Sequence, residues 1–178
     1  DIQWSDCKAG TDREHYQYIP FSHFEIDEYG RQLPAVNRFP SAKDNSGFKH
    51  IADYIHKKGL KFGIHIMRGI PRIAAHNHLP IKGTDTTADK IANPYSISRW
   101  NPDMYGVRSD IYGGQEYYDS IFRLYADWGV DLVKVDDICN TNMYPYDPYS
   151  GKAEIEMIYN AIKNCGRQMV LSLSPGPA

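Results

Sequence analysis

The sequence predicts an α/β fold with parallel strands, and three observations support this prediction. Three stretches carry apolar residues at the i, i+3, i+4 and i+7 spacing of an amphipathic helix. Each stretch ends near a glycine, the residue that most readily adopts the left-handed conformation just after a helix. A short apolar run then follows each glycine almost at once, as is typical of strands buried in a parallel sheet. At 178 residues, the chain is expected to form one domain over residues 1–178.

The predicted elements alternate in a regular order along the chain. Strands are predicted at Asp1–Trp4, Lys61–Met67, Asp131–Asp136 and Gln168–Ser174, and helices around Phe48–Ile55, Ile121–Trp128 and Ile155–Ile162. The strand-to-helix connections are long and the helix-to-strand connections are short. The long loops therefore share the carboxyl edge of the sheet, where α/β enzymes build their sites. A complete (β/α)8 TIM barrel needs about 250 residues, so we expect part of such a barrel, with about four parallel strands and three helices.

Composition excludes several classes of function. With 20 Lys and Arg against 22 Asp and Glu, the net charge of -2 disfavours binding to nucleic acid or an anionic membrane by charge alone. No apolar run approaches the roughly 18 residues of a membrane span. Cys7, Cys139 and Cys165 are too few for a disulfide framework or a paired-cysteine zinc site. His76 and His78 could be two metal ligands, but no third ligand has suitable spacing, so neither a metal nor a cofactor is predicted.

The segment Val133–Asp137 (VKVDD) carries the clearest chemical signal. Lys134 and Asp136 are two positions apart, so in a strand both side chains project from one face near its carboxyl end. A nearby lysine favours the ionised form of a carboxylate. The nucleophile of a retaining glycoside hydrolase must be such an ionised, oriented carboxylate. A buried ion pair, or a carboxylate that caps the next segment, explains the same spacing, which does not choose between these roles.

Neighbouring features leave other interpretations open. Alternation points Asp137 away from Asp136, so a capping or supporting hydrogen bond is favoured for Asp137 over a part in the chemistry. Lys134 could form a Schiff base with a carbonyl substrate, although Asp136 favours the charged amine that this chemistry must avoid. Arg68 and Arg72 flank a turn and could bind a phosphate, but no glycine-rich cradle follows a strand there.

Several segments together resemble one known family. Trp128–Asp136 (WGVDLVKVD) resembles the WGVDxxKxD signature of glycoside hydrolase family 27, the melibiase or α-galactosidase family. Asp1–Trp4 (DIQW) resembles the family's DDxW strand end. Arg38–Pro40 (RFP) with Ile51–Ile64 (IADYIHKKGLKFGI) resembles its FP…LADYxHxxGLKxGI block. The resemblance covers most of the chain. It implies a (β/α)8 barrel and a retaining mechanism that acts on terminal α-galactosyl or stereochemically similar sugars.

The resemblance also implies roles for single residues. Asp136 matches the catalytic nucleophile, and Lys134 matches a sugar-binding lysine. Asp1 matches the first of two aspartates that grip galactose hydroxyls. His65 stands where many members have a tyrosine, and it could bind a sugar hydroxyl or be an internal barrel histidine. Ser174 is a candidate for the sugar contact made in the family by a Cys-Glu-Trp segment, which this sequence lacks.

Two departures from the family pattern affect the expected function. Ile2 stands in place of the second aspartate, which is expected near galactose O4 and O6. A site with an apolar side chain here no longer prefers a sugar that carries the hydroxymethyl hydroxyl. β-L-arabinopyranose is therefore an alternative sugar, because it shares the ring hydroxyl pattern of galactose but lacks the hydroxymethyl group. The general acid/base aspartate of the family comes from a later strand than this chain contains. An inactive carbohydrate-binding fragment is therefore a further alternative.

The expected partner is a galactoside or a related oligosaccharide, and the family leads us to expect secretion or a periplasmic location. Polysaccharide-degrading glycosidases often meet their substrates outside the cytoplasm.

Overall fold

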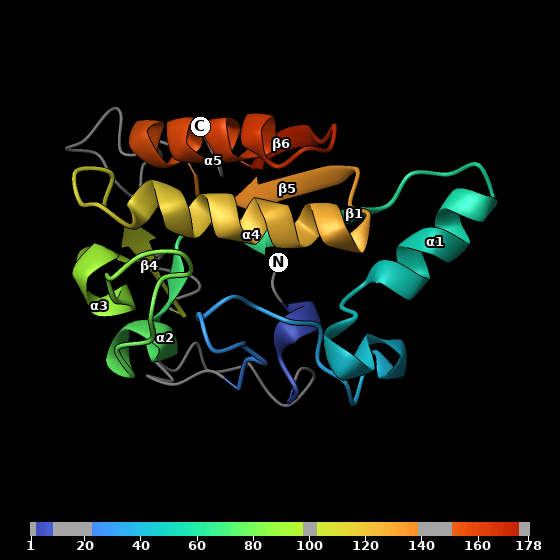
Figure 1. Cartoon of the computed structure of the whole chain (residues 1–178), viewed down its shortest axis with the longest axis horizontal. Coiled ribbons are helices and arrows are strands. Elements are labelled where there is room, and N and C mark those ends of the chain that lie inside the picture. The colour runs from blue at the N-terminus through green and yellow to red at the C-terminus, as the bar shows by residue number, and fades with distance from the viewer. Residues whose placement is uncertain (1–2, 9–22, 98–102, 139–150, 175–178) are drawn as a thin grey trace.

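The computed structural model describes residues 3–8, 23–97, 103–138 and 151–174, and its centre is a parallel sheet. This sheet contains β1 (Gly63–Met67), β5 (Leu132–Asp136) and β6 (Val170–Ser174) in the order β1-β5-β6. Two long helices, α4 (Gly114–Trp128) and α5 (Lys152–Asn164), lie side by side over it (Figure 1). The shorter helix α1 (Lys49–Lys57) precedes β1. The predicted α/β class and its three helix-to-strand units are thus confirmed.

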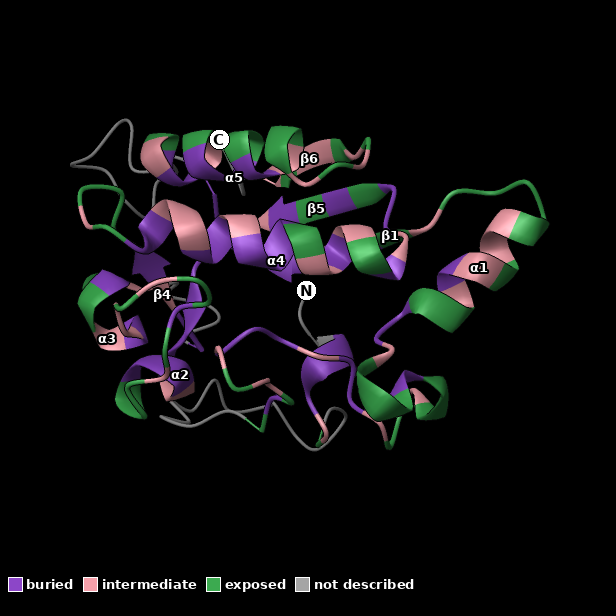
Figure 2. Cartoon of the chain, in the orientation of Figure 1, coloured by how far each residue is buried: buried purple, intermediate pink, exposed green. Residues whose placement is uncertain are grey.

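The ladder of hydrogen bonds gives the parallel sheet two different faces. Ile64 and Ile66 of β1 pair in register with Val133 and Val135 of β5, and all four side chains are buried. The alternate residues of the same strands are more exposed, apart from the buried Met67, and include the polar His65, Lys134 and Asp136. In a closed barrel such a face points into the interior, whereas the helices cover the other face. Figure 2 shows α4 and α5 with buried and exposed stripes, as expected of helices that cover a sheet.

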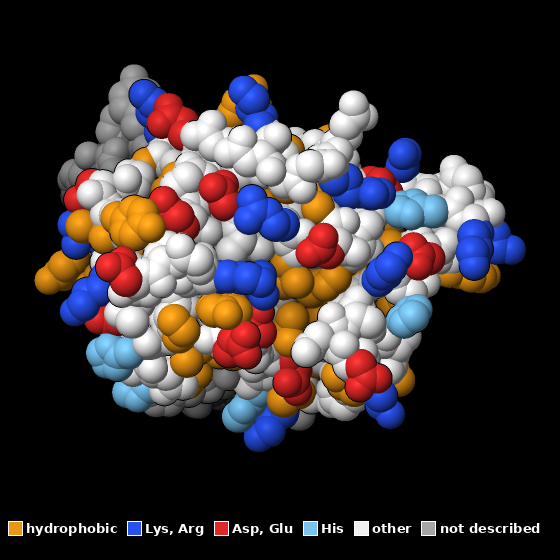
Figure 3. All heavy atoms as spheres, in the orientation of Figure 1, with side chains coloured by type: hydrophobic (Ala, Val, Ile, Leu, Met, Phe, Trp, Pro, Cys, Tyr) orange, Lys and Arg blue, Asp and Glu red, His pale blue; other side chains and the backbone are white. Residues whose placement is uncertain are grey.

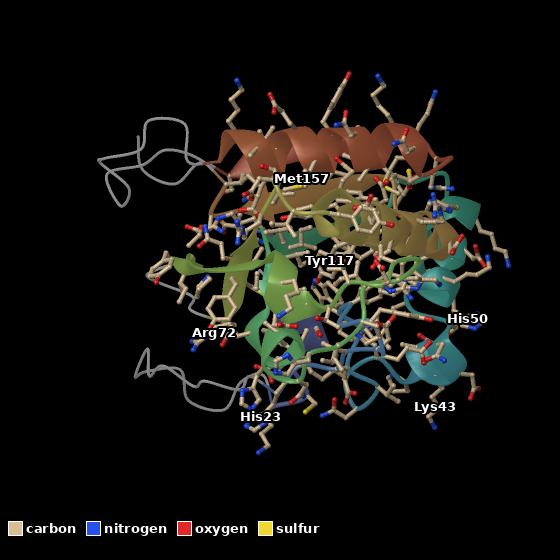
Figure 4. The ribbon with its side chains drawn as sticks, turned by 60° about the vertical axis from the view of Figure 1, so that its left-hand side comes forward. His23, Lys43, His50, Arg72, Tyr117 and Met157 are labelled. Carbon is tan, nitrogen blue, oxygen red and sulfur yellow. The ribbon has the colours of Figure 1, made fainter. Side chains whose placement is uncertain are left out.

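An aromatic cluster fills the space between α1, α4 and β1. The ring of Trp128 contacts those of Trp4 and Phe48 at centroid distances of 6.3 and 5.7 Å, and Phe48 also contacts Phe62 at 5.5 Å. Trp128, Trp4 and Phe48 are buried. Helix α4 then ends at Gly129, whose φ of 82° fits the left-handed stop predicted there. In Figure 4, Tyr117 of α4 lies near the centre of the molecule and Met157 lies just below the ribbon of α5.

The connection from Arg68 to Gly114, predicted as one long loop, contains a second sheet. Its strands β2 (Ile70–Pro71), β3 (Ala92–Ile97) and β4 (Met104–Val107) pair antiparallel in the order β2-β4-β3. Two short helices, α2 (Arg72–His76) and α3 (Ala88–Ile91), lie between β2 and β3 in the chain. The prediction missed these elements because they are too short for hydrophobic periodicity to show.

The strand predicted at Asp1–Trp4 is wrong where the structure describes it. Gln3–Ser5 form a turn of 3-10 helix, η1, and a second such turn, η2, covers Pro40–Asn45. Trp4 is held by its side chain instead, since its indole N–H donates to the carbonyl of His65 at 2.8 Å. Asp1 and Ile2 lie outside the described residues.

The surface carries both signs of charge. On the face shown in Figure 3, lysine and arginine side chains are interspersed with aspartate and glutamate. None of the described helices has both the length and the apolar composition that crossing a bilayer requires. Cys7 and Cys165 are free thiols, and Cys139 lies outside the described residues.

A buried carboxylate joins the amino-terminal ends of the strands. Asp131 accepts hydrogen bonds from the backbone N–H of Phe62 at 2.8 Å and from the guanidinium of Arg167 at 2.7 Å. The His56 ring nitrogen lies 2.6 Å from the same carboxylate. Burial raises the pKa of Asp131, but these hydrogen bonds outweigh it and lower the pKa from 3.8 to about 2. The ionised carboxylate therefore stabilises the fold.

The Asp131→Asn variant tests this stabilisation. Because the folded-state pKa lies below the unfolded one, the carboxylate contributes about 2 kcal/mol above pH 4, and this contribution is lost as the pH falls towards 2. Urea unfolding of the complete protein should show a lower free energy of unfolding for the variant near neutral pH. The difference in free energy between parent and variant should shrink as the pH falls from 4 towards 2. Asp127→Asn, at an exposed position of α4, is the matched control. A difference between parent and Asp131→Asn that does not change with pH would contradict the assignment.

Candidate functional site

Polar side chains gather on the exposed face of the parallel sheet at its carboxyl edge. The register places His65 of β1 beside Lys134 of β5 and Ser172 of β6. One row closer to the edge, Asp136 pairs with Ser174 of β6 and with the buried Met67 of β1. All these residues have the same parity in their strands, so their side chains share one face. Four of the residues singled out from sequence, namely His65, Lys134, Asp136 and Ser174, thus lie in two adjacent rows.

The side chains of His65 and Asp136 approach each other across β1 and β5. His65 Nε2 lies 3.3 Å from Asp136 Oδ2, and the two side chains are 29% and 18% exposed. Burial lowers the pKa of His65 below its usual 6.5, while the charge of Asp136 opposes this shift. The imidazole is therefore mainly neutral at pH 7, when one ring nitrogen can donate and the other can accept a hydrogen bond. Such a ring suits contact with a hydroxyl group.

The remaining candidates divide between the described and undescribed parts of the chain. Lys134 is exposed on the strand that ends in Asp136, so its ammonium can reach a ligand on this face. Asp1, matched to a sugar-binding carboxylate, lies outside the described residues. The segment that it precedes is nevertheless attached to the site, because the Trp4 indole bonds the backbone of His65.

Asp137 forms a buried ion pair, a contact of the supporting kind expected for it. Its carboxylate is 5% exposed and lies 3.1 Å from the guanidinium of Arg68, which follows β1 directly. Arg68 also reaches Glu154 of α5 at 3.1 Å. Sequence reasoning missed this use of Arg68 and did not single out Glu154 at all. One feature of the sequence could have indicated this contact: Arg68 and Asp137 each come directly after a predicted strand, so both lie at the same edge of the sheet.

The described residues offer no metal centre. Among them, no group of three or more His, Cys, Asp or Glu side chains could hold a metal ion. His78 instead lies 3.1 Å from Asp89, a carboxylate that also accepts a hydrogen bond from Thr87.

A cavity of about 830 Å3 lies at the opposite, amino-terminal edge of the sheet, where Asp131, Leu132 and residues 166–170 line it. The polar rows at the carboxyl edge therefore remain the candidate site.

Comparison with known proteins identifies similar chains of greater length. The chain is 57% identical to a GH27 β-L-arabinopyranosidase from Geobacillus stearothermophilus, with a TM-score of 0.88 over 99% of this chain and 39% of that one. It is 55% identical to a protein from Bacillus halodurans C-125 provisionally named an α-N-acetylgalactosaminidase, with a TM-score of 0.88 over 100% of this chain and 40% of that one. Alpha-galactosidase 3 of Hypocrea jecorina is 30% identical over 156 residues, which are 84% of this chain and 22% of the relative.

The chain therefore spans about two fifths of these solved structures and under a quarter of that curated relative. No family model matches the sequence.

The titration of His65 tests the electrostatics of the site. Histidine ring signals in NMR spectra of the complete protein should give His65 a midpoint below pH 6.5. In Asp136→Asn the midpoint should fall further, because the imidazolium loses the carboxylate that stabilises it. Asp44→Asn, at an exposed position of η2, should leave the midpoint unchanged. A midpoint at or above 6.5 in the parent, or no response to Asp136→Asn, would show that the two groups do not interact as described.

Proposed function

Since the chain belongs to glycoside hydrolase family 27, as a segment of its catalytic barrel, we propose that the complete protein is a retaining glycosidase for terminal sugars of galactose-like configuration. The observation that carries this proposal is the placement of Asp136. Its carboxylate ends β5 on the polar face of the sheet, one row beyond Lys134 and 3.3 Å from His65. This position gives a nucleophile a binding surface for the sugar on two neighbouring strands.

The proposed reaction proceeds in two displacements. A carboxylate oxygen of Asp136 attacks the anomeric carbon and forms an ester bond, while the bond to the departing oxygen breaks. That oxygen takes its proton from a carboxylic acid outside this chain. The same group then takes a proton from water, whose oxygen attacks the anomeric carbon and releases Asp136 and the free sugar. Lys134 and His65 orient the sugar by contacts to its hydroxyls, and Asp1 and Ser174 add further contacts.

The sugar is proposed to be an α-galactosyl residue or, favoured by Ile2, a β-L-arabinopyranosyl residue. Several curated relatives are named α-galactosidases, while a much more similar solved chain is named a β-L-arabinopyranosidase. A variant of the latter was solved in complex with arabinose. An isoleucine cannot bind the hydroxymethyl oxygen of galactose, so it removes the advantage that galactose would have over a pentopyranose.

Covalent labelling tests the role of Asp136. An activated 2-deoxy-2-fluoro glycoside should add one sugar mass to the complete protein, and peptide mapping should place it on Asp136. Asp136→Asn should abolish the adduct and lower kcat/KM by at least about 1,000-fold, because the covalent route is lost. Asp127→Asn, the same change on the exposed side of α4, should label like the parent.

Three outcomes would refute this role. One is an adduct mapped to a different residue. Another is borohydride trapping of a carbonyl substrate on Lys134, which would indicate a Schiff-base lyase. The third is sugar binding without turnover in the complete protein, which would indicate a binding function.

The Ile2→Asp variant tests the choice of sugar. The parent should hydrolyse nitrophenyl β-L-arabinopyranoside faster than nitrophenyl α-galactoside. The aspartate should shift the ratio of the two kcat/KM values towards galactose by about 10-fold or more, since it supplies the missing acceptor. Ile2→Val keeps the site apolar and should leave the ratio near that of the parent. A strong galactoside preference in the parent would rule out the proposed role of Ile2.

A further inference from the structure

Asp136 is held from two sides by the residues that follow β1 and β5. The backbone N–H of Arg68 donates to the carbonyl of Asp136 at 3.1 Å. The backbone N–H of Asp137 donates to the side-chain oxygen Oδ1 of Asp136 at 2.8 Å. The first bond fixes the main chain of the strand end, and the second fixes the rotation of the carboxylate. Oδ2 then remains as the oxygen nearest to His65.

The residue that donates the second bond, Asp137, has an unusual backbone conformation. Its φ is 55°, in the left-handed region where residues other than glycine, asparagine and aspartate are strained. This φ directs the carbonyl and the side chain of Asp137, whereas the plane of the Asp136–Asp137 peptide directs its N–H towards Oδ1. Such a conformation persists where surrounding contacts hold it in place.

Arg68 supplies those contacts. Its Nε donates to the carbonyl of Asp137 at 2.6 Å, and its Nη2 lies 3.1 Å from the Asp137 carboxylate. The planar guanidinium thus contacts both the backbone carbonyl and the carboxylate of Asp137. The side chains of Arg68 and Asp137 are 6% and 5% exposed, so solvent screens this pair little.

Glu154 fixes the guanidinium in turn. Its Oε2 lies 3.1 Å from Nη1 of Arg68, and its Oε1 accepts hydrogen bonds from the Val107 N–H at 3.0 Å and the Tyr118 hydroxyl at 2.6 Å. The Tyr118 oxygen accepts a hydrogen bond from the N–H of Gly69 at 2.9 Å. The linked side chains of Arg68 and Glu154 therefore connect five elements: the ends of β1 and β5, β4, α4 and α5.

We propose that Arg68 and Asp137 are positioning residues for the nucleophile, and this proposal rests on the proposed function of Asp136. The pair holds the Asp137 N–H on Oδ1, so Oδ2 is the oxygen that attacks the anomeric carbon. Neither side chain contacts the sugar in this scheme; both act through the orientation of Asp136. A role in stability alone would not require the guanidinium to bond the carbonyl of the residue whose N–H holds the nucleophile.

Kinetics of labelling in the complete protein test the proposal. In Arg68→Met the rate constant for labelling Asp136 with the 2-deoxy-2-fluoro glycoside, and kcat, should fall by about 100-fold, the cost of a small displacement of a reacting group. The dissociation constant of free arabinose or galactose should change by less than about 3-fold, because Lys134 and His65 keep their places. Arg108→Met, which removes an exposed ion pair with Asp110, is the matched control.

A second pair of variants decides the question if Arg68→Met fails to fold. Asp137→Asn keeps a side-chain acceptor for Arg68 and a residue that tolerates positive φ, whereas Asp137→Ala keeps only the backbone carbonyl as an acceptor and tolerates positive φ less well. The labelling rate should fall by about 100-fold in Asp137→Ala and by less than 10-fold in Asp137→Asn.

The outcomes separate the two proposals. A parent that is not labelled on Asp136 would overturn both of them. A parent labelled on Asp136, together with variants labelled at the parent rate or Ala and Asn variants that behave alike, would overturn the positioning role alone. Weakened binding of the free sugar with unchanged kcat would also overturn it.

Discussion

The parallel ladder between β1, β5 and β6 is the constraint on which the rest of the structure depends. It aligns His65 with Lys134 and Asp136 with Ser174, and the same register buries Val133 and Val135 under the helices. Because side chains alternate along a strand, the hydrophobic core and the polar face are specified together. A slip of one residue in β5 would turn Lys134 and Asp136 into the core and expose the two valines. Burial of the valines therefore maintains the geometry of the site.

The two edges of this sheet contain buried charges with different roles. At the amino edge, the Asp131 carboxylate makes polar contacts with His56, Phe62 and Arg167, and this cluster stabilises the fold. At the carboxyl edge, Arg68 holds the residue next to Asp136. The aromatic cluster connects the core to this second edge, because Trp4 packs on Trp128 and also bonds the backbone of His65. Gly47, with a φ of 56°, lies so close to Trp128 that no side chain would fit there.

Much of the fold followed from local sequence patterns. Helical periodicity and the glycines at 59, 129 and 166 located the three helices and the strands after them, because each pattern is long enough to fix its period. The sheet β2-β4-β3 was missed, since β2 has two residues and Pro71 and Pro94 interrupt the usual strand signal. Parity predicted that Lys134 and Asp136 share a face. The pairing of Asp137 with Arg68 was missed, because the two residues lie 69 positions apart and only their common place after neighbouring strands indicates that they meet.

The central claim is that Asp136 is a nucleophile whose orientation is fixed by its neighbour. A crystal structure of the complete protein, trapped with a 2-deoxy-2-fluoro glycoside, tests this claim most directly. We predict a bond between the anomeric carbon and Oδ2 of Asp136, with the Asp137 N–H still donating to Oδ1 and with Lys134 and His65 in contact with the sugar. A sugar bonded to any other residue, or an Asp136 carboxylate turned away from the Asp137 N–H, would contradict it.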